Sequence, residues 1–312
     1  MGTATGNEIM SEAITKLEKL RALLKRYGSC LVAYSGGVDS VFLAYMAHEM
    51  LGDRALAAIA DSPSLPRREL AEALDLAAKF AFPVRVIQTN EFANENYTAN
   101  PANRCYFCKH ELFEKLTPLA IAENFAMIVY GENASDNGDF RPGVQAAAKF
   151  QVRAPLKEAN LTKAEIRELS TQLGLPTANK PQMACLSSRV PYGEAVTPEK
   201  LRMIEAAECV LRDLGFYDVR VRHHETQIPL MLKGSDGQTK ETPPSSIPQP
   251  LCPSTILARI EVGPAEIQEI FAAGVTDKVT KALKHIGYHY VTLDLQGYRR
   301  GSANEILPKN AL

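Results

Sequence analysis

The sequence has no marked excess of charge of either sign. Its 312 residues include 35 Lys and Arg against 36 Asp and Glu, a formal net charge of -1. A general nucleic-acid-binding protein carries a net positive charge or a broad basic surface. We therefore expect no nucleic-acid partner, although a local basic patch is compatible with this balance.

A long hydrophobic run is also absent. No uninterrupted apolar stretch approaches the roughly 20 residues that cross a bilayer, and the start MGTATGNEIM has no cationic segment followed by an apolar one. We therefore expect a cytoplasmic protein with no membrane partner. The apolar content of 46% and charged content of 23% are those of soluble globular proteins, which makes intrinsic disorder of the whole chain an unfavourable interpretation.

Cysteine is scarce, with six residues in the chain, too few for a disulfide scaffold. Cys105 and Cys108 form a Cys-x-x-Cys pair, which in a reducing compartment indicates metal or redox chemistry. The pair lies at a predicted loop-to-helix junction between Arg104 and Lys109, so we expect lowered thiol pKa values there. A third thiol, Cys185, lies in an irregular segment.

Apolar runs of strand length alternate with helical patterns through the first part of the chain. Strands are predicted at 30–34, 55–60, 84–88 and 127–130, and helices at 8–27, 38–51, 65–80, 108–124 and 162–174. Strands separated by helices predict an α/β fold with a parallel sheet and helices on both faces.

The second part predicts a smaller α+β domain. Thr197-Pro198 is typical of a helix start, so we place the boundary just before it, giving domains 1–195 and 196–312. Its predicted helices are 198–214, 264–273 and 276–286, and its predicted strands are 218–222, 255–262 and 288–295. The stretch at about 226–254 holds six of the nineteen prolines and is predicted to be a flexible insertion.

The hexapeptide from Ser35 to Ser40, SGGVDS, lies where a predicted strand ends and a helix begins, which is where α/β sheets bind ligands. Its two glycines let the backbone approach an anion, and amides of the helix start together with two hydroxyls can donate to it. An ordinary glycine turn is the alternative. The chain lacks Gly-x-x-x-x-Gly-Lys-Ser/Thr and Gly-x-Gly-x-x-Gly, which excludes a kinase-type P-loop and the dinucleotide fingerprint.

The three thiols have three interpretations: unremarkable cysteines, a structural zinc site, or a redox-active cluster. Structural zinc normally takes four ligands, and no second Cys-x-x-Cys or His-x-x-x-His accompanies the pair. Three thiolates can hold a 4Fe-4S cluster with one iron open to an extra sulfide. We expect the cluster, with other sulfur chemistry at the same cysteines and an inert role as alternatives.

Charged residues of the second domain form a further candidate site. Glu208 falls on the apolar stripe of the helix at 198–214, so its carboxylate must be paired or must bind a ligand. Arg220 and Arg222 share one face of the following strand, and Glu261 lies on the next strand. A structural ion-pair network and a site for phosphate and a divalent ion both fit this pattern.

The hexapeptide is the motif of the PP-loop, or N-type ATP pyrophosphatase, superfamily. With it, five further motifs resemble the LarE family: SLPRREL at 64–70, RCYFCK at 104–109, GEN at 131–133, ACLSSR at 184–189 and ARIEV at 258–262. The resemblance runs from Ser35 to the final strand, with the proline-rich stretch as the main departure. LarE proteins are ATP-dependent sulfur transferases of nickel-pincer nucleotide biosynthesis, the route to the lactate racemase cofactor.

In that family each carboxylate of a pyridinium dicarboxylate mononucleotide is adenylated and then converted to a thiocarboxylate. Members with only the cysteine of the ACLSSR motif sacrifice its side chain as the sulfur source, whereas members with three cysteines resemble cluster-dependent sulfur carriers. This chain has all three, at Cys105, Cys108 and Cys185, so the resemblance favours the cluster.

The resemblance implies ATP, Mg²⁺ and a 4Fe-4S cluster as cofactors. The implied ATP-binding residues are Ser35, Gly36, Gly37, Asp39 and Ser40, with Asp39 helping to position Mg²⁺. The implied substrate-binding and phosphate-binding residues are Arg104, Asp136, Arg141, Ser188, Arg189, Arg220 and Arg222. Candidate ligands of a divalent ion are Glu208, Glu261 and Glu269. Expected partners are the nucleotide substrate, a sulfur donor or other proteins of the cofactor pathway, and further copies of the chain in a homo-oligomer, with a hexamer as the candidate number.

Other functions remain open on the sequence. A tRNA thiolase can combine a PP-loop with three cysteines, but the balanced charge and the lack of an evident RNA-binding appendage disfavour it. An amide-forming ligase such as an NAD or GMP synthetase gives the cysteines no task. A nucleotide-binding or cluster-binding module without turnover is the non-enzymatic alternative.

Overall fold

The structure is a computed structural model that describes residues 6–136, 142–181, 184–227, 254–299, 301–302 and 305. Its described residues form two units: one contains the chain up to Ser187 and Tyr192–Thr197, and the other contains Ser188–Pro191 and the chain from Pro198 onward. That the predicted domains 1–195 and 196–312 fold separately stays a prediction. Residues 228–253, nearly all of the predicted insertion, lie outside the described residues.

The first unit is built on a parallel four-stranded sheet. Its strands are β1 (Cys30–Tyr34), β2 (Ala55–Asp61), β3 (Val84–Gln88) and β4 (Met127–Tyr130), in the order β3-β2-β1-β4. β1 pairs in parallel with β2 and with β4, and β2 pairs in parallel with β3. The predicted α/β fold class is confirmed, and the shared direction brings all four carboxyl ends to one edge.

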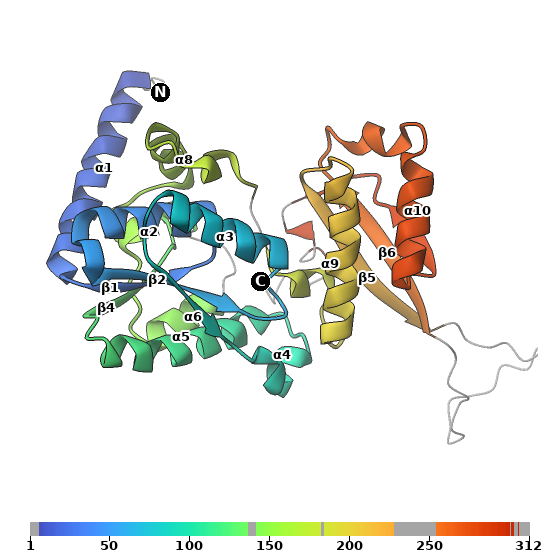
Figure 1. Ribbon diagram of the computed structural model, residues 1–312, viewed down its shortest axis with the longest axis horizontal. Helices are drawn as coiled ribbons and strands as arrows, with labels where there is room; N and C mark the ends of the chain where they lie inside the picture. Colours follow the sequence, from blue (N-terminus) through green and yellow to red (C-terminus); the bar gives the residue numbers. More distant parts are fainter. Residues whose placement is uncertain are drawn as a thin grey trace, which may run out of the picture. The chain divides into compact units, whose positions relative to one another are not determined.

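Helices cover both faces of this sheet. They are α1 (Gly6–Tyr27), α2 (Val38–Leu51), α3 (Arg67–Lys79), α4 (Glu95–Thr98), α5 (Arg104–Ala122), α6 (Pro142–Lys149), α7 (Pro155–Glu158) and α8 (Lys163–Gln172). Short 3-10 helices are η1 (Gly52–Arg54), η2 (Glu91–Ala93), η3 (Ala134–Asp136), η4 (Pro176–Asn179) and η5 (Leu186–Arg189). Buried side chains of α1, α2, α3 and α8 pack on one face, and those of α5 and α6 pack on the other (Figure 1).

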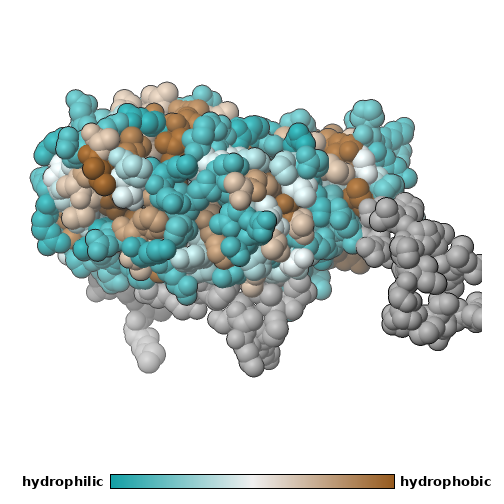
Figure 2. All heavy atoms as spheres, turned by 90° about the horizontal axis from the view of Figure 1, so that it is seen from below, coloured by the Kyte–Doolittle hydropathy of each residue, from teal (hydrophilic) through white to brown (hydrophobic). Residues whose placement is uncertain are grey.

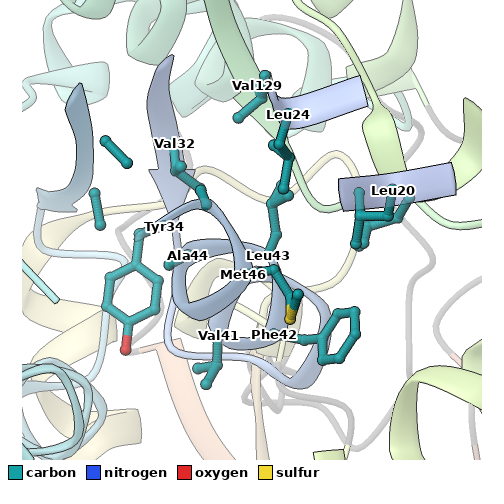
Figure 3. Packing of buried hydrophobic residues seen from close by; sticks show 14 of the residues in the cluster. Leu20, Leu24, Val32, Tyr34, Val41, Phe42, Leu43, Ala44, Met46 and Val129 are labelled. Carbon is teal, nitrogen blue, oxygen red and sulfur yellow. The ribbon is translucent and has the colours of Figure 1, made fainter. Parts of the chain in front are cut away.

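Alternation along β1 separates the two halves of the core. Val32 and Tyr34 point to the face where α1 and α2 pack, and Figure 3 shows them beside Leu43 of α2. Leu31 and Ala33 point to the other face, which α5 covers. A buried strand with apolar residues on both sides is expected in a parallel sheet with helices on both faces. This packing fixes the end of β1, from which the phosphate loop starts.

The second unit contains a three-stranded mixed sheet with helices on one face. Its strands are β5 (Val219–Gln227), β6 (Ser254–Val262) and β7 (Tyr290–Leu293), and its helices are α9 (Pro198–Asp213), η6 (Ile267–Phe271) and α10 (Val275–Ile286). β5 and β6 are antiparallel, and β6 and β7 are parallel. Val219, Val221 and Ile260 join Leu211 and Leu283 of the helices in one core. The charged residues that alternate with them along β5 lie on the opposite face.

Two predicted helices differ from the structure. The helix predicted at 264–273 is wrong, because only the 3-10 helix Ile267–Phe271 forms there. The Glu266 carboxylate accepts hydrogen bonds from the backbone N–H groups of Tyr217, Asp218 and Gly263 at 2.6–3.2 Å, which ties this segment to the start of β5 as a turn. The helix predicted from Cys108 begins at Arg104, so it includes both thiols of the Cys-x-x-Cys pair.

The face of the surface in Figure 2 is largely hydrophilic, with hydrophobic residues in scattered patches. Scattered exposed hydrophobic side chains are ordinary on protein surfaces. Within the described residues, no helix combines the length and the hydrophobicity that a bilayer span requires.

Candidate functional site

The hexapeptide turns sharply between β1 and α2. Gly36 has a φ of +69°, and a Cβ on it would lie 2.8 Å from the Cβ of Ala73 on α3. Both the left-handed backbone and the close approach of α3 require glycine at this position. Gly37 precedes α2 and has no side chain to cap it. The first backbone N–H groups of α2 are therefore available to an anion at the loop.

Hydroxyl groups hold the loop closed. The Ser35 and Ser40 Oγ atoms are 3.0 Å apart, and Ser40 Oγ also accepts from the Ser35 N–H at 3.1 Å. The Ser40 hydroxyl lies 3.1 Å from the Gly37 carbonyl oxygen, to which it donates. These bonds lie within the hexapeptide itself, so the loop needs no distant residue to adopt this conformation.

The end of β4 reaches the same place. A Cβ on Gly131, the first residue of the GEN motif, would lie 3.0 Å from the backbone nitrogen of Ser40 and 3.2 Å from the Cβ of Asp39. Only glycine allows this approach without a shift of the first turn of α2. The GEN motif thus contributes backbone space beside the phosphate loop.

Asp39 lies in the first turn of α2, and its Oδ2 accepts a hydrogen bond from Lys163 Nζ at 2.6 Å. Carboxylate and hydroxyl oxygens are the donors that Mg²⁺ prefers. The oxygens of Asp39, Ser35 and Ser40 therefore fit a magnesium ion chemically. Neither ATP nor Mg²⁺ binding at these residues is established by their geometry alone.

The three cysteines of the LarE-like motifs belong to the same unit. Cys105 and Cys108 are one turn apart at the start of α5, and Cys185 directly precedes η5. Solvent reaches Cys105 most, and Cys108 and Cys185 are partly covered. A negative charge on Cys185 raises the pKa of both Cys105 and Cys108, so the three thiols lie within electrostatic reach of one another.

The expected lowering of the thiol pKa values is wrong. Desolvation raises the pKa of Cys105, with a further rise from Cys185, and the opposing effects of Arg104 and Lys109 are smaller. Desolvation also raises the pKa of Cys108, and the charge of Glu91 adds to it. The sequence shows the nearby cations but not the burial. A metal bound here would have to displace protons from Cys105 and Cys108.

A cluster site is not formed among the described residues. They contain no group of three His, Cys, Asp or Glu side chains arranged to hold a metal ion. Three thiolates suit a 4Fe-4S cluster chemically, but these thiols are not set at ligand positions in this structure. The cluster stays a prediction, and so does a divalent ion at Glu208, Glu261 and Glu269.

Three buried hydroxyls fix the segment that carries Cys185. Tyr97 is 1% exposed, and its hydroxyl oxygen is 2.6 Å from Ser187 Oγ. Ser64 Oγ is 3.1 Å from Ser187 Oγ and also bonds to the Tyr97 hydroxyl. The Leu186 N–H donates to the Ser64 carbonyl at 2.9 Å. We call Ser64, Tyr97 and Ser187 the hydroxyl cluster.

Arg104 supports the same segment from α5. Its guanidinium is 3% exposed and donates to the carbonyl oxygen of Ser187 at 2.9 Å and to the side-chain oxygen of Asn100. Asn100 is itself fully buried. Arg104 therefore joins α5 to the Cys185 segment, and its predicted contact with substrate stays a prediction.

Asp136 ends η3, and its Oδ2 accepts from the Asn133 N–H at 3.1 Å. The side chain thus closes a turn after β4, at the carboxyl edge of the sheet. Arg141 lies outside the described residues. A substrate role for either stays a prediction.

In the second unit, the predicted charged residues form buried ion pairs. Arg189 is fully buried and donates to both carboxylate oxygens of Glu208, at 2.8 and 3.1 Å. Arg222 donates to both oxygens of Glu261, at 3.0 and 2.9 Å. Glu208 also accepts from the Val221 N–H at 3.0 Å. The ion-pair interpretation of Glu208 and Glu261 is confirmed.

The remaining predicted residues of this unit lie around these pairs or apart from them. The Arg220 guanidinium is 4.7 Å from the ring centre of Tyr298, and burial lowers its pKa, as does the charge of Arg189. The Ser188 carbonyl accepts from Arg222 at 2.7 Å. Glu269 is exposed on η6. Phosphate binding by Arg220, Arg222, Ser188 and Arg189 stays a prediction.

Known proteins resemble this chain from end to end. It is 31% identical over 304 residues to the pyridinium-3,5-bisthiocarboxylic acid mononucleotide synthase of Lactiplantibacillus plantarum, an alignment that covers 97% of this chain and 99% of that protein. The chain belongs to the LarE family. An uncharacterized protein of a Synechocystis species is 42% identical over 295 residues, covering 95% of this chain and 99% of that protein.

A more distant relative belongs to the glutamine-hydrolysing GMP synthase of Pyrococcus furiosus, as one of the chains of that enzyme. It is 26% identical over 214 residues, which cover 63% of this chain and 67% of that protein. With the parallel sheet, this match agrees with the PP-loop fold predicted from the hexapeptide. No family model matches the chain.

Sequence reasoning missed three positioning residues in this LarE-family chain: Tyr97, Asn100 and Lys163. Ser64 and Ser187 lie within quoted motifs, yet no pattern indicated that their side chains meet. An available signal was a tyrosine and an asparagine, both uncharged and polar, just before the RCYFCK motif. Polar residues that fall close to a candidate site and turn out to be buried are expected to be hydrogen-bonded.

Proposed function

We propose that this LarE-family chain is an ATP-dependent sulfur transferase. It adenylates a carboxylate of pyridinium-3,5-dicarboxylate mononucleotide and converts it to a thiocarboxylate during nickel-pincer nucleotide biosynthesis. The observation that carries the proposal is the presence, in one unit, of a preformed phosphate loop and three mutually coupled thiols. The similarity to the Lactiplantibacillus plantarum synthase supports the substrate.

In the first step, the phosphate loop would hold the pyrophosphate part of ATP. The amides that follow Gly37 and the hydroxyls of Ser35 and Ser40 donate to phosphate oxygens, and Asp39 would orient Mg²⁺ against them. A carboxylate oxygen of the substrate attacks the α-phosphorus, and the bond to the pyrophosphate oxygen breaks. The products are an acyl-adenylate and pyrophosphate, whose charge the loop and the ion stabilise.

In the second step, sulfur replaces the activated oxygen. A sulfur nucleophile held at Cys105, Cys108 and Cys185 attacks the acyl carbon, and AMP leaves with the former carboxylate oxygen. The hydroxyl cluster and Arg104 keep the Cys185 segment in place for this attack. We propose that a 4Fe-4S cluster on these thiolates carries the sulfur, since it would offer an open iron site for a sulfide.

The second unit would bind the phosphate of the mononucleotide. Arg220 and Arg222 lie on the helix-free face of β5, and Arg189 brings a further buried positive charge to that unit. Guanidinium groups held by carboxylates are preorganised for phosphate recognition. Ser188, the three glutamates, a sulfur-donor protein and a homo-oligomer complete the proposal.

Incubation with ATP, Mg²⁺ and the dicarboxylate mononucleotide tests the first step. We expect AMP and pyrophosphate to form in equal amounts, and only when the mononucleotide is present. AMP formation that depends on tRNA instead would favour a tRNA thiolase. Iron and sulfide analysis after anaerobic reconstitution tests the carrier: we expect about four irons per chain, and zinc alone would exclude the cluster.

A further inference from the structure

Lys163 is the first residue of α8, and it contacts the phosphate loop directly. Its Nζ lies 2.6 Å from Asp39 Oδ2. Its backbone N–H donates to Ser135 Oγ at 3.0 Å, which ties the start of α8 to the turn after β4. Thr162 and Glu165 form a capping box around it. The backbone at Lys163 is therefore fixed, while the ammonium group extends to the loop.

Helix stability does not explain a lysine at this position. A positive charge in the first turn of a helix is opposed by the helix dipole. Asp39, in the first turn of α2, is by contrast favourable to its own helix. The Lys163 side chain is 32% exposed and that of Asp39 is 20% exposed. A pair this accessible contributes at most about 1 kcal/mol, so stability is a weak reason for it.

We propose that Lys163 is a phosphate-positioning residue that occupies the cation position at Asp39 until Mg²⁺-ATP binds, and then contacts a phosphate oxygen of the nucleotide. The inference rests on the proposed function, because it assumes that the phosphate loop binds ATP. It adds a second cation to that site, supplied by the chain itself.

Two positive groups cannot share one carboxylate oxygen at 2.6 Å. A Mg²⁺ ion that takes Asp39, directly or through a bound water, displaces the ammonium by competition and by repulsion. Lysine is a compact charge on a flexible stem, so its ammonium can move to a new acceptor while its backbone stays in place. The nearest new anion is then the phosphate chain of ATP in the adjacent loop.

The variant Lys163→Met tests this with two ligands. Mn²⁺ alone, a countable substitute for Mg²⁺, should bind roughly two- to fivefold more tightly than to the wild type, because its competitor at Asp39 is gone. ATP with Mg²⁺ should bind about tenfold or more weakly, because a charged contact to phosphate is lost. Lys163→Arg should restore part of the ATP affinity, since it keeps the positive charge.

Lys157→Met is the matched control. Lys157 also pairs with an acidic side chain near the end of β4, Glu132, at 2.7 Å, but that pair does not include the phosphate loop. It should change neither affinity by more than about twofold, as is usual for a change away from a binding site. Calorimetric titration of ATP and electron paramagnetic resonance of free Mn²⁺ give the two affinities.

Weaker binding of both ligands to Lys163→Met, or no change in either, would make Lys163 a structural ion-pair partner and overturn the inference. Failure of the wild type to bind ATP would instead overturn the proposed function. A wild type that binds ATP, with a variant that separates the two ligands in opposite directions, supports both.

Discussion

The phosphate loop and the cysteine region of the first unit are built in different ways. The loop is closed by hydrogen bonds among Ser35, Gly37 and Ser40, all within six residues. The segment with Cys185 is held by side chains from distant places in the chain, at Ser64, Tyr97 and Arg104. A locally closed site tolerates changes elsewhere, whereas an assembled site depends on every segment that contacts it. The two steps of the proposed reaction should therefore respond to different substitutions.

The largest expected effect separates the two regions completely. Cys185→Ala should lower thiocarboxylate formation by about a thousandfold or more, because the sulfur-bearing group is lost. ATP affinity should stay within about twofold of the wild type, since the loop forms by itself. Product assay and ATP titration measure the two effects. Cys209→Ala on α9 is the control and should lose neither, and equal loss of ATP binding in Cys185→Ala would contradict the separation.

The converse substitution is Gly36→Ala. The left-handed backbone costs roughly 1–2 kcal/mol in any residue with a Cβ, and contact with Ala73 adds overpacking of about 1–3 kcal/mol. We expect a lower midpoint of urea unfolding and at least about tenfold weaker ATP binding.

Gly37→Ala is the control for stability, because its φ of -83° suits alanine. A Cβ there would lie 3.5 Å from Ser35 Oγ, an ordinary contact. Its unfolding midpoint should stay near that of the wild type. Equal destabilisation by both variants would show that close approach to α3 is not what requires Gly36.

Tyr97→Phe should loosen the assembled region alone. It removes the hydroxyl that bonds to Ser64 and Ser187 and should lower the free energy of unfolding by about 1–3 kcal/mol. Cys185 should react faster with iodoacetamide, as quantified by peptide mass spectrometry, while ATP affinity remains unchanged. Tyr217→Phe, at a side chain that is 63% exposed, is the control. An unchanged Cys185 rate in Tyr97→Phe would show that the hydroxyl cluster does not position this cysteine.

The smallest expected effect is a difference in pH dependence. Because burial raises the pKa of Cys105 and Cys108, less thiolate is present at neutral pH than in an exposed cysteine. Their alkylation rates should be slow near pH 7 and should still be rising at about pH 9–10. ATP affinity should change little between about pH 8 and pH 9, because backbone amides do not titrate. A plateau of the alkylation rates below pH 8 would contradict the raised values.

These contrasts also explain which features the sequence could predict. The α/β fold and the phosphate loop depend on local patterns: apolar strands, glycine turns and one hexapeptide. Glu208 on an apolar helix stripe correctly predicted a buried, paired carboxylate, and Arg189 is its partner. The position of Arg189 nineteen residues earlier could not be derived from helical spacing.

The cysteine region was predicted in composition but not in arrangement. Cations beside Cys105 suggested lowered pKa values, yet desolvation outweighs them, and burial is a property of the folded chain. Tyr97 and Lys163 were missed for a related reason. Their partners, Ser187 and Asp39, are 90 and 124 residues away in sequence. Contacts of that range follow from topology, and no spacing rule along the chain indicates them.

Mass spectrometry of product and protein after one incubation tests the central claim most directly. Anaerobically reconstituted chain with ATP, Mg²⁺ and the dicarboxylate mononucleotide should yield a product in which sulfur has replaced a carboxylate oxygen, together with AMP, and Cys185 should keep its mass. Loss of H₂S from Cys185 would replace the cluster with a sacrificed side chain. A product without sulfur, or no AMP at all, would contradict ATP-dependent sulfur transfer by this chain.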